Sequence, residues 1–423
     1  MKIFRIIRLY IFYILKYLIF LFFYPLVIFI NKIKKYKFIK FAEVRMDRIG
    51  HIGYEVEGHL VGKKISDELN NCKIIYFFGL YICNKQIEKM VRRILPISHK
   101  LFSLFFLLLY KSLKFWKKNE HILDFTNFSI YDGPAIISIS KRYNKFEYNK
   151  TNLHFTKDEK KKGFELIKKL GLNEGDKWIC FHNRDSYYLR KKYPNREWSY
   201  HDYRNFSVSS LKSAAEFFAS KGFFVVRMGA HQSEKLETNN PKIIDYANSS
   251  FKNDFLDMYL LANSKFYFGS NSGPKGVSII FKRPSYGVNW PPTELYIDPA
   301  LFINFDVPFY PFLFTFKRIK DLSSGKLISL KDFLNSDFSN AYSQSTFKEN
   351  NVTLIDNTAD QIKSLAIEID KQLRGEEIEN IEDKKIQEEF WKIYFAYSKI
   401  KKYGTIQPKI SPSFLRQNLD LLN

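Results

Sequence analysis

The chain has 423 residues, with 67 Lys and Arg against 44 Asp and Glu, so its formal net charge is +23. A chain of this length is too long to fold around one small hydrophobic core, so we expect two domains of about 150 to 200 residues. Three cysteines without C-x-x-C spacing argue against a disulfide framework or a zinc site. This excess of positive charge favours binding to nucleic acid, anionic lipid or phosphorylated substrates. However, the sequence contains no RNP, zinc-finger or compact basic-helix motif.

The amino-terminal segment, residues 1–40, contains nine Lys and Arg and no acid. Leu9 to Ile30 is an apolar run broken only by Lys16 and Pro25. About 20 apolar residues can cross a bilayer, but a central lysine and a proline weaken a crossing helix. Basic residues flank both ends, which favours a segment lying in the membrane surface over a single span and leaves both open. A cleaved signal peptide is not indicated.

A strand is predicted at residues 41–46, and a helix is predicted to begin at Tyr54. Between them Gly50 and Gly53 allow the backbone to approach a ligand closely. His51 lies between the two glycines, where an imidazole is suited to accept a proton near neutral pH. A packing or capping role for this histidine is the alternative. Three nearby carboxylates could orient it or act in its place: Asp47, Glu55 and Glu57.

The rest of the first half predicts a strand at 73–78 and a helix at 85–93. An apolar run at 101–110 is either a buried helix or a second surface that contacts the membrane, since it is too short to cross. Residues 142–176 are rich in Lys, Asn and Gly and are interpreted as the connection into a second domain.

Strands then alternate with helices. Strands are predicted at 178–182, 223–226, 242–246, 265–268 and 285–289, and helices at 156–170, 208–218 and 255–262, the last capped by Asp254. This alternation predicts a parallel sheet with ligands at the carboxyl ends of its strands. Residues 313–332 are interpreted as a connector. A capping box at Thr358 predicts a core helix, and a charged helix is predicted at 376–402.

A small-residue loop, Gly269-Ser270-Asn271-Ser272-Gly273, follows one of these strands and precedes an apolar helix. Small residues allow close approach, and the free N–H groups of the helix attract an anion such as a phosphate. The loop matches neither the P-loop nor the dinucleotide-binding pattern. Ordinary N-capping by Ser270 or Ser272 is the alternative.

Two arginines follow neighbouring strands and should lie at the same rim as this loop. Arg184 comes after the 178–182 strand, and Arg227 with Gly229 follows the 223–226 strand. A guanidinium can donate two hydrogen bonds to a diphosphate. A surface salt bridge is the default role of either arginine alone. Their placement together with the loop favours an anion site.

The segment from Leu260 to Asn289 resembles the donor-binding segment of heptosyltransferase-type glycosyltransferases. The chain is also similar to a family of glycosyltransferases from bacterial surface-polysaccharide loci, such as those for lipopolysaccharide or O-antigen. The similarity runs from about Val44 to Leu415. The motifs that carry it are Arg184-Asp185, Asp202-Tyr203-Arg204-Asn205, Arg227-Met228-Gly229, Asp245-Tyr246-Ala247, the Gly269–Gly273 loop and Asn357-Thr358.

The resemblance implies a GT-B fold, in which two Rossmann-like domains face a cleft. It divides the chain into a membrane-anchoring segment 1–40, an acceptor domain 41–155, a sugar-nucleotide domain 156–350 and carboxyl-terminal helices 351–423 that pack back on the acceptor domain. It implies transfer from a nucleotide sugar to a lipid-linked glycan at the cytoplasmic face of the bacterial inner membrane, with no nucleic-acid partner.

No D-x-D motif occurs in the sequence, so we expect transfer without a metal ion or other cofactor. The expected donor-binding residues are Arg184, Arg227, Gly229, Ser270, Asn271, Ser272 and Gly273. The expected catalytic residues are His51 and Asp47, with Gly50, Gly53 and Glu55 on the acceptor side. Whether transfer inverts or retains configuration is open. Two alternatives to a transferase are a non-catalytic membrane scaffold and a basic nucleic-acid-binding protein.

Overall fold

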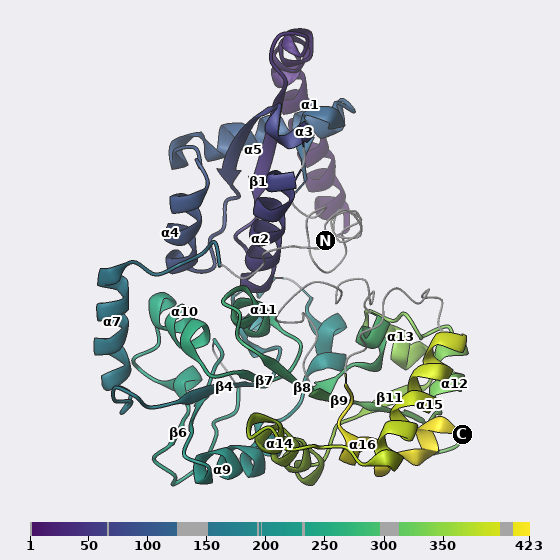
Figure 1. Ribbon diagram of the computed structural model, residues 1–423. Helices are drawn as coiled ribbons and strands as arrows, with labels where there is room; N and C mark the ends of the chain where they lie inside the picture. The colour runs from purple at the N-terminus through teal and green to yellow at the C-terminus, as the bar shows by residue number, and fades with distance from the viewer. Residues whose placement is uncertain are drawn as a thin grey trace. The chain divides into compact units, whose positions relative to one another are not determined.

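The computed structural model describes residues 2–124, 151–296, 313–397 and 409–423, apart from positions 66, 193, 196, 231 and 232. The chain divides into two compact units (Figure 1). Unit 1 is Met1–Tyr143 with Asn152–His154, and unit 2 is Asn144–Thr151 with Phe155–Asn423. Both are mixed α/β structures with parallel sheets, which confirms the predicted fold class.

Unit 1 is built on a three-stranded parallel sheet in the order β2-β1-β3. Its strands are β1 (Ile39–Val44), β2 (Lys73–Phe78) and β3 (Ile122–Leu123). Its helices are α1 (Lys2–Ile33), α2 (Ile49–Ile65), α3 (Asp67–Asn70), α4 (Lys85–Ile94) and α5 (Ser103–Phe115), with 3₁₀ turns η1 (Lys100–Phe102) and η2 (Asn119–His121).

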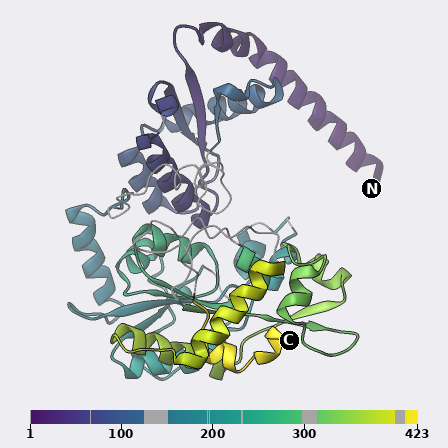
Figure 2. The same cartoon turned by 45° about the vertical axis from the view of Figure 1, so that its right-hand side comes forward.

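One face of the carboxyl-terminal half of α1 packs in the core of unit 1. Phe23, Val27 and Ile30 are buried in one cluster with side chains of α5 and of the sheet. Phe20 is also buried and its ring packs on Phe115 of α5, and the Trp116 indole N–H donates to the carbonyl of Phe20 over 3.2 Å. The preceding part of α1 extends beyond α5 (Figure 2). This buried face of α1 therefore helps to cover the sheet of unit 1.

Helix α2 begins earlier than predicted. It starts at Ile49, so Gly50, His51 and Gly53 lie in its first turns and not in an open strand-to-helix turn. Ile52 and Val56, four residues apart on one helix face, are fully buried. Burial of this face outweighs the low helix propensity of the glycines.

Unit 2 is built on a six-stranded parallel sheet in the order β6-β5-β4-β7-β8-β9. The strands are β4 (Trp178–His182), β5 (Phe224–Arg227), β6 (Ile243–Ile244), β7 (Tyr267–Gly269), β8 (Ser285–Trp290) and β9 (Leu313–Phe316). All residues of β4, β7, β8 and β9 are buried, as expected for strands covered on both faces. An antiparallel pair, β10 (Arg318–Asp321) and β11 (Val352–Ile355), lies outside this sheet.

Helices cover both faces of the large sheet (Figure 1). Leu211, Phe218, Ile362 and Ile369 pack in one cluster with the strands. The helices of unit 2 are α7 (Lys157–Lys168), α8 (Tyr187–Lys192), α9 (Lys212–Ser220), α10 (Asp254–Asn263), α11 (Gly273–Ile280), α12 (Leu330–Asn335), α13 (Gln344–Glu349), α14 (Ala359–Leu373), α15 (Ile381–Tyr397) and α16 (Pro412–Arg416). Its 3₁₀ turns are η4 (Ser199–Arg204), η5 (Val208–Leu211), η6 (Tyr246–Asn248), η7 (Pro292–Tyr296) and η9 (Leu419–Leu422).

Two predictions for unit 2 are wrong in detail. The expected connector at 313–332 contains β9 and β10, because the buried Leu-Phe-Thr-Phe run pairs with β8. Asn253, not Asp254, caps α10 by accepting from the Leu256 N–H over 2.9 Å. The carboxyl-terminal helices contribute to the core of unit 2, since Phe390 and Phe414 pack on Phe316 of β9. That they also pack on the acceptor domain stays a prediction.

Candidate functional site

The strand order of unit 2 reverses between β4 and β7. The chain runs from β4 outward to β5 and β6 on one side, and then returns to build β7, β8 and β9 on the other. Ligands of parallel α/β sheets bind where the strand order reverses, beyond the carboxyl ends of the strands. His182 ends β4 and Gly269 ends β7, so the segments that follow these two residues form the candidate site.

At Gly269 the end of β7 lies directly against the end of β4, and there is no room for a side chain. Its φ is +151°, and a Cβ atom would lie 2.0 Å from the carbonyl oxygen of His182. The Ser270 N–H donates to that same carbonyl over 3.0 Å. The small-residue loop therefore begins with its backbone held directly against the end of β4.

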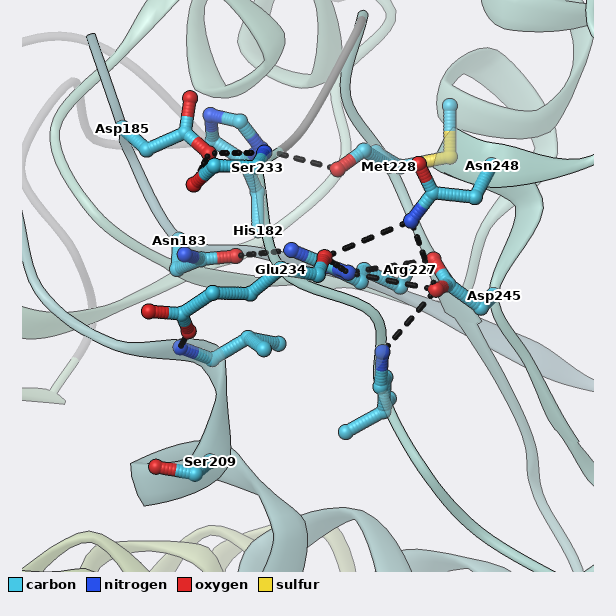
Figure 3. Close-up of polar contacts among 12 residues, drawn as sticks. His182, Asn183, Asp185, Ser209, Arg227, Met228, Ser233, Glu234, Asp245 and Asn248 are labelled. Atoms are coloured by element: carbon cyan, nitrogen blue, oxygen red, sulfur yellow. Dashed lines mark hydrogen bonds and ion pairs between the residues drawn. The ribbon is translucent and has the colours of Figure 1, made fainter. Parts of the chain in front are cut away.

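The first group of side chains at this rim is the Arg227 cluster: Arg227, Asn183, Asp185, Glu234 and Asp245 (Figure 3). Arg227 is fully buried. Its Nη1 donates to the Glu234 carbonyl over 2.6 Å and lies 3.3 Å from both carboxylate oxygens of Asp245. Its Nη2 donates to Asn183 Oδ1 over 3.1 Å. Arg227 thus occupies the predicted strand end, but it directs its donors into the protein.

His182 lies beside this cluster and is also buried (Figure 3). Its Nδ1 donates to the Met228 carbonyl over 3.0 Å. Burial lowers the pKa of His182 to about 4, opposed by this hydrogen bond. The imidazole is therefore neutral at pH 7, with its proton on Nδ1.

The second group is the Lys275 cluster: the cations Arg184, Arg204, Lys275 and Lys317, the acid Glu294, and the amides Asn205 and Asn271. Arg204 Nε lies 2.9 Å from Glu294 Oε1, and Arg204 also donates to the Asn271 carbonyl. Asn271 Nδ2 donates to Glu294 Oε2 over 2.7 Å, and Lys275 Nζ donates to Asn271 Oδ1 over 3.2 Å. The Lys275 ammonium also lies 4.3 Å from the centroid of the Trp290 ring.

Asn205 ties the other two cations to this cluster. Arg184 donates to its side-chain oxygen and, over 3.0 Å, to the His201 carbonyl. Lys317 Nζ donates to the Asn205 carbonyl over 2.6 Å and lies 2.8 Å from Asp356. The motif Asp202–Asn205 therefore supplies two members of the cluster, and Arg204 and Lys317 are residues that sequence reasoning did not select.

Positive charge exceeds negative charge among the most buried members of the Lys275 cluster. Arg184, Lys275 and Lys317 are each at least nine-tenths buried, and Glu294 is the acid of the cluster that is buried to the same degree. Burial lowers the pKa of Lys275 to about 7 and that of Arg184 to about 10, and Arg204 adds to both decreases. Burial also lowers the pKa of Lys317. An anion placed here would relieve this repulsion.

The remaining predicted donor-side residues surround the start of α11. Ser270 and Asn271 are buried, while Ser272 and Gly273 are half-buried. Ser272 occupies the N-cap position and makes no capping hydrogen bond with its side chain, which instead contacts Ser270 and Tyr267. Gly229 follows β5 with φ of +153°. Asn357 of the Asn-Thr motif bonds Asn289 reciprocally and so holds the end of β8.

In unit 1 the predicted residues gather at the carboxyl end of β1. Asp47 is half-buried and lies 4.0 Å from Arg48, and Glu55 is buried 3.5 Å from Arg45. The backbone of His51 lies in the first turn of α2. Glu43 lies one residue before the carboxyl end of β1 and was not selected from the sequence. Burial raises the pKa of its carboxyl group.

Glu57 has a structural role. It is buried and accepts from the backbone N–H groups of Asn152 and Leu153 at 3.2 and 3.3 Å, and from Asn152 Nδ2 at 2.6 Å. These bonds fasten residues 152–154 to unit 1. Among the residues that the structure describes, His, Cys, Asp and Glu form no group of three or more that could hold a metal ion. Metal independence stays a prediction.

No family model matches the sequence, and no curated protein matches it. Solved structures similar to the chain are glycosyltransferases. A glycosyl transferase family 9 protein from Veillonella parvula is 10% identical over 60% of this chain and 81% of its own, with a TM-score of 0.35. The ADP-heptose lps heptosyltransferase II of E. coli is 12% identical over 59% and 84%, with a TM-score of 0.35.

A third similar structure is the iron-containing dodecameric glycosyltransferase TibC from enterotoxigenic E. coli. It is 11% identical over 80% of this chain and 78% of its own, with a TM-score of 0.37.

Proposed function

We propose that this protein is a glycosyltransferase that moves a sugar from a nucleotide-sugar donor to a glycan acceptor. The observation that carries the proposal is the Lys275 cluster. Buried cations exceed buried acids beside a small-residue loop at the strand-order reversal. Sugar transfer releases a nucleoside diphosphate, and cations with helix N–H groups stabilise that leaving group.

The Lys275 cluster replaces Arg227 as the proposed diphosphate site. Arg184, Arg204 and Lys275 would bind the phosphates together with the backbone N–H of Gly273, so no divalent ion is required. Arg227 becomes a positioning residue, because it holds Asn183 at the end of β4. Lys275 would gain a proton as the diphosphate binds, since a neighbouring anion raises a lysine pKa.

In unit 1 the base that takes the acceptor proton would be His51, assisted by Asp47, if transfer inverts configuration. Glu43 is a second candidate, because a carboxyl group with a raised pKa is better matched to proton transfer near neutral pH. The acceptor would be a lipid-linked glycan of a bacterial surface polysaccharide. The reaction would take place at the cytoplasmic face of the inner membrane.

Calorimetric titration of the full chain in mild detergent with UDP, GDP, CMP and ADP tests the donor site. One nucleotide should bind in the presence of EDTA, and Lys275→Met should weaken that binding by about tenfold or more. Lys265→Met is the matched control, because Lys265 is an exposed lysine just before β7. Absence of nucleotide binding would leave the scaffold alternative, and tighter binding of oligonucleotides would favour the nucleic-acid alternative.

Turnover is tested by mass spectrometry of lipid-linked glycans incubated with the donor that binds. A mass increase by one sugar establishes transfer. His51→Ala, Asp47→Asn and Glu43→Gln then separate the three candidate bases, and the base is the residue whose loss lowers kcat without weakening nucleotide binding.

A further inference from the structure

Helix α1 presents two different faces along its exposed length. Ile11, Leu15, Leu18 and Phe22 follow a helical spacing of three or four residues and are 52, 55, 54 and 77% exposed. Residues at this spacing share one side of a helix. Phe29 continues the same side. We call these five residues the apolar face of α1.

A row of tyrosines lies on another side of the helix, beside the exposed Ile14 and Leu21. Tyr10, Tyr13, Tyr17 and Tyr24 recur at spacings of three, four and seven residues and are 42 to 66% exposed. Tyrosine favours the boundary between acyl chains and water, where its ring is apolar and its hydroxyl is wet. A crossing helix collects such residues at its two ends. Here they run along the helix axis, as expected of a helix that lies parallel to the membrane surface.

The apolar face of α1 continues onto a second element. A groove of about 580 Å³ runs between α1 and the start of α5, and aliphatic and aromatic side chains line it. On the other side it is bordered by Leu101 of η1 and by Leu104 and Phe105 of α5, which are 81, 53 and 42% exposed. Because η1 leads directly into α5, we count Leu101 with the start of that helix. A contiguous exposed apolar surface of this kind marks an interaction site.

The packing of α1 argues against a crossing helix. The window that is long and apolar enough to cross a membrane is Tyr13–Ile33. This window includes Phe23, Val27 and Ile30, which lie in the core of unit 1, and Phe20, which is buried against Phe115. The part of α1 before Phe20 would be about 27 Å long at 1.5 Å per residue, shorter than a hydrocarbon core of about 30 Å. It also carries Arg5, Arg8 and Lys16.

The charge around this surface identifies the partner as an anionic bilayer. Helix α1 contains Lys2, Arg5, Arg8, Lys16 and Lys32 and no acid. Cations at the edge of an inserted apolar surface pair with anionic headgroups, and lysines can extend their ammonium groups to the boundary.

We propose that the apolar face of α1 and the start of α5 together insert into the acyl region of one leaflet of an anionic membrane, with α1 lying in the surface and not crossing it. The inference does not depend on sugar transfer, and its tests do not require activity. It selects between the two membrane arrangements that the sequence left open and adds α5 to the docking surface.

Flotation of the full chain with vesicles tests the surface. The wild type should float with vesicles of phosphatidylglycerol and phosphatidylethanolamine more than with phosphatidylcholine vesicles. Leu101→Asp with Leu104→Asp should lower the bound fraction by about tenfold or more, since each exposed leucine would otherwise enter lipid. Leu101→Phe with Leu104→Phe should retain binding. Ile381→Asp, at a residue 77% exposed in unit 2, is the matched control. Equal flotation of the aspartate variant and the control overturns the role of α5.

Thiol labelling tests whether α1 crosses. Lys2→Cys is compared with Lys326→Cys, an exposed position in unit 2, in bacterial spheroplasts treated with a membrane-impermeant maleimide. If α1 lies in the cytoplasmic leaflet, both introduced cysteines react only after lysis. Reaction of Lys2→Cys in intact spheroplasts, with Lys326→Cys protected, overturns the surface arrangement and establishes a span.

Discussion

The Arg227 and Lys275 clusters lie at the same edge of one sheet, yet they differ in charge balance. Around Arg227 one buried cation faces the carboxylates of Asp245, Asp185 and Glu234, which raise its pKa against the effect of burial. In the Lys275 cluster, buried cations outnumber buried acids and lower one another's pKa. The first cluster is complete without a ligand, and the second is stabilised by an added anion.

This difference teaches that an arginine at a strand end is not by itself an anion site. Arg227 and Arg184 have similar positions, since Arg227 is the last residue of β5 and Arg184 lies two residues after the end of β4. Their partners separate them: Arg227 bonds a carboxylate, whereas Arg184 bonds a carbonyl and an amide oxygen that carry no charge.

The largest effect is expected from Arg227→Ala. Removing the guanidinium leaves Asp245, Asn183 and the Glu234 carbonyl without their buried partner, so the free energy of unfolding should fall by about 3 to 5 kcal/mol. Urea denaturation of the full chain measures this loss. Arg190→Ala is the control, because Arg190 is 59% exposed in its pair with Asp202 and should cost about 1 kcal/mol or less. Equal losses in the two variants would show that the Arg227 cluster is not structural.

Gly269→Ala should destabilise unit 2 by about 3 kcal/mol, since the new Cβ would meet the His182 carbonyl at 2.0 Å and the backbone has φ of +151°. Gly171→Ala is the matched control: it also has positive φ, but nothing lies within 4 Å of its Cβ. The control should cost about 1 kcal/mol. Thermal unfolding of both variants measures the difference, and similar melting temperatures would contradict the close approach of β4 and β7.

Lys275 should make stability depend on pH. Its pKa falls from 10.5 to about 7 on folding, so the unfolded chain binds more protons between these values. The free energy of unfolding should therefore increase as the pH rises, by about 2 kcal/mol from pH 7 to 9. Lys275→Met should lose this increase, as shown by urea denaturation across the pH range. An unchanged slope in Lys275→Met would place the titrating group elsewhere.

The smallest effect expected is on ligand affinity. If diphosphate binding requires the Lys275 ammonium, the Kd of the nucleotide that binds should rise about tenfold from pH 7 to 8.5. The reason is that Lys275 loses its proton in this range when no nucleotide is bound. Lys275→Arg should keep its charge and give a Kd independent of pH there. Calorimetry at the two pH values decides this. A constant Kd in the wild type means that the anion binds away from Lys275.

Much of the strand pattern could be predicted from sequence, because buried parallel strands are short apolar runs bounded by polar residues. The ranges 73–78 and 178–182 match β2 and β4 residue for residue, and the capping box at Thr358 is present. The start of α2 and the strand β9 were missed. In both cases burial in the folded protein outweighed the local sequence signal. Glycines had indicated a turn where α2 begins, and the segment that contains β9 had been interpreted as a connector.

The sequence by itself determined that the chain is α/β, that a small-residue loop follows a buried strand, and that cations and polar residues collect at the carboxyl ends of the strands. These follow from periodicity and from residue type, which act locally. Only the tertiary structure decided which cation is balanced and which is not, because Lys275 of α11 and Glu294 of η7 are brought close together through Asn271. It also decided that one face of α1 is core, since the partners of Phe20 and Phe23 are Phe115 and Phe105, far along the chain on α5.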